Sequence, residues 1–99
     1  ENIRGEYDVI ALTNDAVFLV ETKMSPNVDH LKAFKHKIEN FPRLFEEFAG
    51  KPIIPILASL RFDDAFIDVA SKAGVYLLAY REWDYMDILN FDRVKAQSN

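Results

Sequence analysis

Hydrophobic residues are concentrated in two short segments near the start of the chain. Residues 7–12 (YDVIAL) and 16–23 (AVFLVETK) are rich in β-branched and aromatic side chains, which favour strands. Thr13, Asn14 and Asp15 lie between the two segments and are typical of a tight turn. The pattern therefore predicts an antiparallel β-hairpin.

A helical period follows the hairpin. Apolar residues recur at spacings of three and four, which predicts a helix with one apolar face formed by Val28, Leu31, Phe34, Ile38 and Phe41. Asn27 is suited to cap the start of this helix. Pro42 is expected to kink the helix or to begin a second helical segment, which Gly50 would end.

The second half of the chain has the order strand, helix, strand. Residues 52–60 (PIIPILASL) predict a strand that is covered on both faces, although Pro55 favours an edge position or a bulge. Residues 75–80 (VYLLAY) predict the next strand. Strands joined through a helix in this way are normally parallel, so we expect a βαβ unit.

Capping and breaking residues mark the boundaries of the remaining elements. Asp63 or Asp64 is suited to begin the helix of the βαβ unit, and Gly74 is suited to end it. Residues 83–91 are apolar but irregular and predict one more short strand or helix. Residues 92–99 are expected to form a C-terminal tail.

The hairpin and the βαβ unit together predict an α/β fold with a mixed sheet flanked by helices. The 99 residues are 49% hydrophobic, enough for one core, so we expect a single domain over residues 1–91. The first strand begins only a few residues after Glu1. We therefore expect the domain to be truncated at its N-terminus.

The charge pattern is mixed. A net charge of −4 disfavours generic nucleic-acid binding, which depends on clustered lysine and arginine. A local basic surface is nevertheless expected on the first helix, which carries His30, Lys32, Lys35, His36 and Lys37.

The absence of cysteine excludes disulfides and thiolate metal sites. The sequence shows no charged-then-apolar leader, and no apolar run approaches the roughly 20 residues that span a bilayer. We therefore expect a cytoplasmic protein that does not enter a membrane.

Two acidic residues and a lysine are candidates for chemistry. Side chains alternate along a strand, so Glu21 and Lys23 share one face and Thr22 takes the other. If the hairpin loop has two or four residues, opposed residue numbers sum to 29 and Asp8 lies opposite Glu21. A loop of three residues would turn Asp8 to the other face.

Paired carboxylates on adjacent strands repel each other unless a cation or a metal ion balances them. Lys23 would supply the cation and leave room for a hard ion such as Mg²⁺ or Mn²⁺, which prefers oxygen ligands. The alternative is a solvent-facing strand end with an ordinary ion pair between strands, worth under about 1 kcal/mol.

These residues carry a family resemblance. GEYDVIA (residues 5–11) followed by VFLVETK (residues 17–23) resembles the metal-binding core of the PD-(D/E)XK nuclease superfamily, which has the restriction-endonuclease-like fold. In that superfamily an acid begins one strand, and the next strand ends in an acid, any residue and a lysine. Asp8, Glu21 and Lys23 match these positions, and the downstream order of helices and strands is similar as well.

The resemblance implies hydrolysis of phosphodiester bonds in nucleic acid, with DNA as the first candidate. Asp8 and Glu21 would hold Mg²⁺ or Mn²⁺, with the Thr22 carbonyl as a further ligand, and Lys23 would orient the attacking water. His30 and Lys37 border the apolar face of the first helix and are candidate contacts for a substrate phosphate. The alternative for both is a solvated polar face.

The sequence also departs from the family pattern. Active members commonly add a glutamate from a helix upstream of the strands, and no such helix precedes residue 6. The alternative function is therefore a catalytically inactive relative that binds nucleic acid or protein. Such a module could form a homodimer through the aromatic residues Trp83, Tyr85 and Phe91. Retention of catalysis, strandedness, sequence preference and the mode of cutting are left open.

Overall fold

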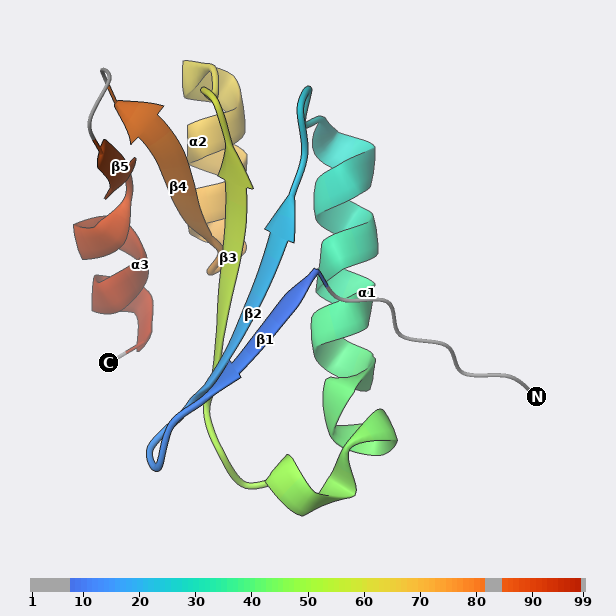
Figure 1. Ribbon diagram of the computed structural model, residues 1–99. Coiled ribbons are helices and arrows are strands. Elements are labelled where there is room, and N and C mark those ends of the chain that lie inside the picture. The colour runs from blue at the N-terminus through green and yellow to red at the C-terminus, as the bar shows by residue number, and fades with distance from the viewer. Residues whose placement is uncertain (1–7, 82–84, 99) are drawn as a thin grey trace.

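The computed structural model describes residues 8–81 and 85–98, which form a five-stranded mixed sheet and three α-helices (Figure 1). The elements in chain order are β1 (Val9–Leu12), β2 (Val17–Thr22), α1 (Val28–Leu44), a 3₁₀ turn (Glu46–Phe48), β3 (Ile53–Ser59), α2 (Asp64–Lys72), β4 (Tyr76–Arg81), β5 (Tyr85–Ile88) and α3 (Phe91–Ser98). The predicted α/β class with a mixed sheet is confirmed. None of the described helices combines the length and the apolar character that a membrane crossing requires.

The hairpin has the register that an even-numbered loop predicts. Val9 lies opposite Val20 and Leu12 lies opposite Val17, so opposed residue numbers sum to 29. Thr13 closes the loop, because its N–H donates to the Ala16 carbonyl at 3.0 Å and its hydroxyl accepts from the Ala16 N–H at 3.0 Å. The predicted register is therefore confirmed.

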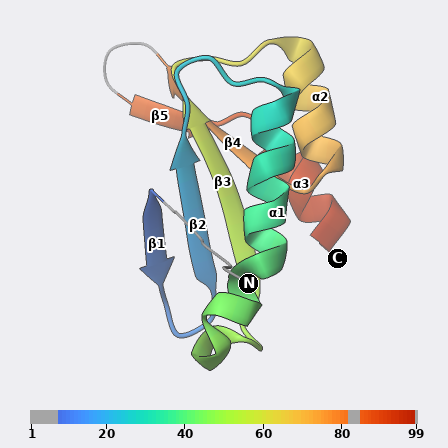
Figure 2. The same ribbon diagram turned by 90° about the vertical axis from the view of Figure 1, so that its right-hand side faces the viewer.

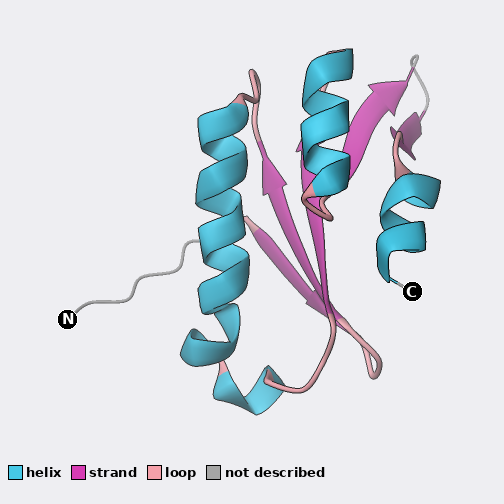
Figure 3. Ribbon diagram, turned by 180° about the vertical axis from the view of Figure 1, so that it is seen from behind, coloured by secondary structure: helices cyan, strands magenta, loops and turns pink. Residues whose placement is uncertain are grey.

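The strands lie in the sheet in the same order as in the chain. β2 pairs parallel with β3, and β3 pairs parallel with β4, whereas the two outer pairs are antiparallel. The crossover helices α1 and α2 lie on the same face of the sheet (Figures 2 and 3). The core fills the space between this face and the helices and includes Val17, Leu19, Leu31, Phe34, Phe41, Leu57, Phe66 and Leu77.

The opposite face of the sheet has no helix over it in the part of the chain that the structure describes (Figure 2). Several of its apolar side chains are only half-buried, among them Phe18, Val20, Ile54 and Ile56. For the described residues, the expectation that the strand at 52–60 is covered on both faces is therefore wrong.

Pro55 lies in a central strand, so the expectation of an edge position or a bulge is wrong. The N–H of Val17 donates to the Pro52 carbonyl at 2.9 Å, so the even-numbered residues of β3 direct their backbone groups to β2. Pro55 is odd-numbered and faces the β4 side. Pairing with β4 begins only at Ile56. The missing N–H of proline therefore removes no hydrogen bond between strands.

Helix α1 begins as predicted, since the side chain of Asn27 accepts the N–H of His30 at 2.9 Å. The helix continues through Pro42 to Leu44, so the second segment begins at Glu46 and not at Pro42. Phenylalanines gather where the helix ends. The ring of Phe41 stacks on those of Phe45 and Phe48, with centroids 4.8 and 6.3 Å apart. We attribute the position of the helix end to this cluster.

Helix α2 has both predicted caps. The side chain of Asp63 accepts the N–H of Phe66 at 2.7 Å. Gly74 has a φ of 79°, which side chains with a Cβ rarely adopt, and the N–H of Val75 then reaches back to the Ala70 carbonyl at 3.0 Å. The chain can therefore turn directly from α2 into β4.

Residues 91–98 form a helix, so the expectation of a C-terminal tail is wrong for the described residues 92–98. Helix α3 follows β5 and buries Val94, which is 2% exposed. Arg93 bonds to Asp68 of α2 at 2.8 Å. Contacts with α2 therefore hold a helix whose own sequence is mostly polar. Trp83, one of the aromatic residues expected at a dimer surface, lies outside the described residues.

Asn90 joins the C-terminal helix to the rest of the fold. It is 2% exposed, and its side-chain oxygen accepts the N–H of Leu77 at 2.9 Å. Its amide nitrogen donates to the Ser71 hydroxyl and to the Val75 carbonyl, each at 2.9 Å. One buried side chain thus satisfies polar groups from α2, from β4 and from the turn between them.

Replacing Asn90 is expected to destabilise the fold strongly. Asn90→Ala removes three hydrogen bonds and leaves buried donors and acceptors without partners, so the free energy of unfolding should fall by about 2–3 kcal/mol. Chemical denaturation followed by circular dichroism measures this change. Lys95→Ala, on the exposed side of α3, is the control and should change stability by less than about 0.5 kcal/mol. Equal stability of the two variants would contradict the assigned role of Asn90.

Candidate functional site at the carboxyl end of β2

The predicted site lies where two parallel strands end. β2 ends at Thr22 and its parallel neighbour β3 ends at Ser59, at the same edge of the sheet. The N–H of Lys23 donates to the Ala58 carbonyl at 3.0 Å, which extends the pairing one residue beyond β2. Ligands of α/β sheets bind preferentially beyond the carboxyl ends of such strands.

Glu21 is a buried charge with a specific partner. The residue is 3% exposed, and its Oε1 lies 2.5 Å from the Nζ of Lys37 on α1. A carboxylate that leaves water needs a cation or several hydrogen bonds to offset its lost hydration. Lys37 supplies that cation while its own side chain stays 28% exposed.

The partner of Glu21 differs from the one that the sequence predicted. We expected Lys23 to balance the acids, and we weighed Lys37 as a phosphate contact or as part of a solvated face. For Lys37 the solvated face is wrong, because the residue is half-buried against Glu21. The sequence did contain a signal for this contact, because Lys37 lies beside the apolar face of the helix that follows β2 in the chain.

Asp8 directly precedes β1, and continuing the hairpin register one residue beyond the Val9–Val20 pair sets it opposite Glu21. Its Oδ2 accepts two hydrogen bonds from Thr22, from the backbone N–H at 2.8 Å and from the hydroxyl at 3.0 Å. The side chain of Asp8 therefore provides β2 with an acceptor at the end of the hairpin. This role of the Thr22 N–H and hydroxyl was not predicted from the sequence, which assigned only the Thr22 carbonyl a place in the site, as a further metal ligand.

The surroundings of Asp8 favour its ionised form. The hydrogen bond from the Thr22 backbone N–H holds the pKa of Asp8 below its usual range, and the Thr22 hydroxyl and the charges of Lys37 and Lys23 act in the same direction. These effects outweigh the opposing effect of desolvation. Asp8 therefore brings a negative charge to this edge of the sheet at neutral pH.

The oxygen donors at this edge are of the kind that Mg²⁺ prefers. Among residues 8–81 and 85–98, no three His, Asp or Glu side chains gather as a complete set of metal ligands. Asp8 and Glu21 each retain one carboxylate oxygen without a hydrogen bond to a described residue. Mg²⁺ commonly takes one or two carboxylates and completes its shell with water and substrate phosphate. Zinc, which favours His and Cys ligands, does not fit this donor set.

His30 and Lys37 lie on the same side of α1, because seven residues correspond to two helical turns. The Nδ1 atom of His30 is buried and has no hydrogen-bond partner among the described residues. His36 is exposed, as expected for a residue that points away from the apolar face. The two predicted phosphate contacts therefore share a side of the helix, and one of them already contacts Glu21.

The structure brings Asp8, Glu21 and Lys23 to one edge of the sheet and adds Thr22 and Lys37 to the same site. Among the described residues of this site, the carboxylates of Asp8 and Glu21 and the ammonium groups of Lys23 and Lys37 have balanced formal charges. Comparisons of the chain with protein-family models, with curated protein sequences and with solved structures gave no match. The residues of the site are therefore the evidence for its chemistry.

Removing the partner of Glu21 is expected to destabilise the protein. Lys37→Met leaves a buried carboxylate without its cation, so the free energy of unfolding should fall by about 3 kcal/mol in urea denaturation. The double variant Glu21→Gln/Lys37→Met removes the stranded charge and should recover part of this loss.

Lys72→Met is the matched control for Lys37→Met. Lys72 pairs with Asp68 at 3.2 Å, but this pair is exposed, so the loss should be under about 1 kcal/mol. If Lys37→Met were as mild as Lys72→Met, or if the double variant were no more stable than Lys37→Met, the pair would not hold the structure as we infer.

Thr22 is expected to tune the acidity of Asp8. Thr22→Val removes the hydroxyl donor and should raise the pKa of Asp8 toward its usual value, whereas Thr22→Ser keeps the donor and serves as the control. Carboxyl ¹³C NMR over a pH titration measures both. The backbone N–H remains in both variants, so the rise should be partial.

The same shift has a consequence for stability. Because the pKa of Asp8 is lower in the folded chain, its contribution to stability is present above the usual aspartate pKa and is lost as the pH falls through the folded value. This acid-dependent loss should be smaller in Thr22→Val than in Thr22→Ser. An unchanged Asp8 titration in Thr22→Val would contradict the assignment.

Proposed function

We propose that this chain contains the core of a Mg²⁺-dependent nuclease that hydrolyses phosphodiester bonds in nucleic acid, with DNA as the first candidate. One observation carries the proposal. Continuing the hairpin register one residue beyond the Val9–Val20 pair sets Asp8 opposite Glu21, and Lys23 follows Glu21 by two residues, just past the carboxyl end of β2. This is the arrangement that the resemblance to PD-(D/E)XK nucleases requires. The mixed sheet with two parallel crossovers supports the restriction-endonuclease-like fold.

In this proposal Asp8 and Glu21 hold the metal ion through their remaining carboxylate oxygens, with the Thr22 carbonyl as a further ligand. A bound Mg²⁺ supplies Lewis acidity toward the phosphate group. Thr22 keeps the Asp8 carboxylate ionised and oriented through its two hydrogen bonds. Lys37 positions the Glu21 carboxylate through the contact between its Nζ and the Glu21 Oε1.

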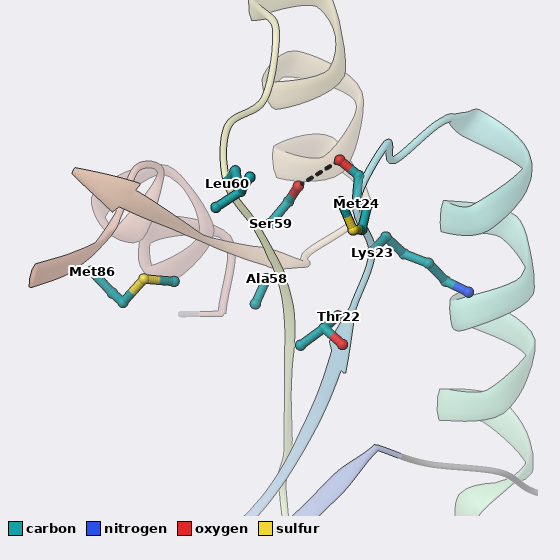
Figure 4. A pocket seen from close by; sticks show the side chains of 7 residues that line it. All are labelled: Thr22, Lys23, Met24, Ala58, Ser59, Leu60 and Met86. Atoms are coloured by element: carbon teal, nitrogen blue, oxygen red, sulfur yellow. Dashed lines mark hydrogen bonds between the residues drawn. The ribbon is translucent and has the colours of Figure 1, made fainter. Parts of the chain in front are cut away.

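Lys23 is the proposed catalytic residue. Its side chain extends toward α1 in Figure 4, on the side of the sheet that carries the helices. An ammonium group there would donate hydrogen bonds to the attacking water and stabilise the negative charge that builds on the phosphate oxygens. His30 and Lys37 are the proposed contacts for neighbouring phosphates, because they continue a basic side along α1.

A binding module without catalysis is the alternative, and one observation favours it. Lys37 already neutralises Glu21, so the charge balance of the buried carboxylate does not require a metal ion. Such a module would bind nucleic acid or protein at the same edge. Metal binding and cleavage distinguish the two functions.

The site variants should separate metal binding from catalysis. Asp8→Asn and Glu21→Gln should lose Mn²⁺ binding in isothermal titration calorimetry. Lys23→Met should keep Mn²⁺ binding but reduce Mg²⁺-dependent cleavage by about 100-fold or more. Cleavage is measured on labelled single-stranded DNA, double-stranded DNA and RNA.

Asp15→Asn is the control for these variants. Asp15 is an exposed carboxylate in the loop at the other end of the hairpin, so its loss should leave metal binding and cleavage unchanged. If the unsubstituted protein bound no Mn²⁺ and cut none of the three substrates, the proposal of a nuclease would be rejected. Binding of nucleic acid without either property would instead support the non-catalytic module.

A further inference from the structure

A hollow of about 280 Å³ lies beside the proposed active site, at the carboxyl ends of β2 and β3 (Figure 4). We call it the methionine hollow, and its lining includes Thr22, Lys23, Met24, Ala58, Leu60 and Met86. Small-molecule sites typically occupy about 300–1,000 Å³, so this hollow suits a small group and not a large ligand.

Large apolar side chains around the hollow are exposed to water. Met24 is 84% exposed, Leu60 is 63% exposed and Met86 is 44% exposed. Met24 lies two residues after the end of β2, whereas Met86 comes from β5 at the far edge of the sheet. Exposed apolar groups that converge from distant parts of a chain mark a binding surface more often than a structural one.

The residue type indicates what the hollow would bind. The chain has only two methionines, and both line this hollow. Methionine is flexible and polarizable, and its sulfur makes favourable contacts with the edges of aromatic rings. The hollow is therefore suited to a planar aromatic group whose exact shape can vary.

The hollow shares its wall with the charged site. Lys23 is one of the lining residues, and in Figure 4 its side chain extends toward α1, away from Met86 and Leu60. Thr22, which also lines the hollow, donates to Asp8. A ligand that occupied both places would have an aromatic part next to an anionic part, which is the chemistry of a nucleotide.

We infer that the methionine hollow receives an unpaired nucleobase of the strand whose phosphate is cut at Asp8, Glu21 and Lys23. This inference rests on the proposed nuclease function and specifies its substrate. A base inside a duplex is already stacked and paired, so reaching the hollow costs unstacking energy. The preferred substrates are therefore single strands, overhangs and frayed ends.

The two methionines provide a direct test. Protein labelled with ¹³C at the methionine methyl groups should give two methyl NMR signals, and both report on the hollow. The probes are a short single-stranded DNA, the same strand with abasic sites in place of its bases, and a blunt duplex. Ca²⁺ replaces Mg²⁺ in the titrations, because it takes the same kind of oxygen ligands.

The single strand should shift both methyl signals, and the abasic strand and the duplex should leave them near their starting positions. Met24→Ala and Met86→Ala should each weaken binding of the single strand by up to about tenfold, the loss expected when an aromatic base loses its contact with a methionine sulfur. Val69→Ala is the control, since Val69 is a 42% exposed apolar residue on α2 and does not line the hollow.

The outcomes separate this inference from the nuclease proposal. If the original chain cuts DNA as proposed but neither methyl signal moves with the single strand, only the nucleobase site is wrong. Equal shifts with the abasic strand would also overturn it, because the hollow would then not read a base. If no nucleic acid is bound or cut, the nuclease itself is rejected, and the nucleobase site with it.

Discussion

The rest of the structure depends on the burial of one carboxylate. Glu21 ends the apolar run of β2 almost out of contact with water, and only a cation delivered to the same place makes this position tolerable. Lys37 lies on α1. Its amino group can therefore reach Glu21 only if the helix has one particular rotation about its own axis and one particular position along β2. The Asn27 cap and the parallel crossover to β3 set both. One ion pair therefore links the helix, the sheet and the candidate site.

The alternation of side chains along β2 divides the site between the two faces of the sheet. Glu21 lies on the face that the helices cover, and the Thr22 side chain takes the other face, where Thr22 lines the methionine hollow. A nucleotide bound as we infer would straddle the end of the strand. Its phosphate would then lie near the charged residues and its base would lie in the methionine hollow, although the residues that contact the two parts are neighbours in the sequence.

The features that the sequence predicted well are local ones. The parity of the loop between the first two strands determined whether Asp8 lies opposite Glu21, and the caps at Asn27, Asp63 and Gly74 depend on hydrogen bonds within a few residues. Such features need no knowledge of distant contacts. The α/β class followed from the order of these local elements.

The features that the sequence did not predict depend on contacts between distant elements. Pro55 is tolerated in a central strand because its backbone nitrogen, which has no hydrogen, faces β4 just before the pairing with β4 begins. Predicting this would require the register between the two strands. The C-terminal helix is mostly polar and is held by Val94 and Asn90 against α2 and β4. Lys37 was placed on the correct side of its helix, but its partner lies 16 residues away in the sequence.

The hairpin loop has an evolutionary consequence. Loops usually tolerate insertions and deletions better than the strands they join. A gain or loss of one residue between Leu12 and Val17 would slip the pairing and turn one carboxylate to the wrong face while most of the core survived. If the carboxylate pair is under selection, this loop should drift freely in composition across related genes but resist single-residue changes in length. Its length would then distinguish relatives that keep the site from relatives that share only the fold.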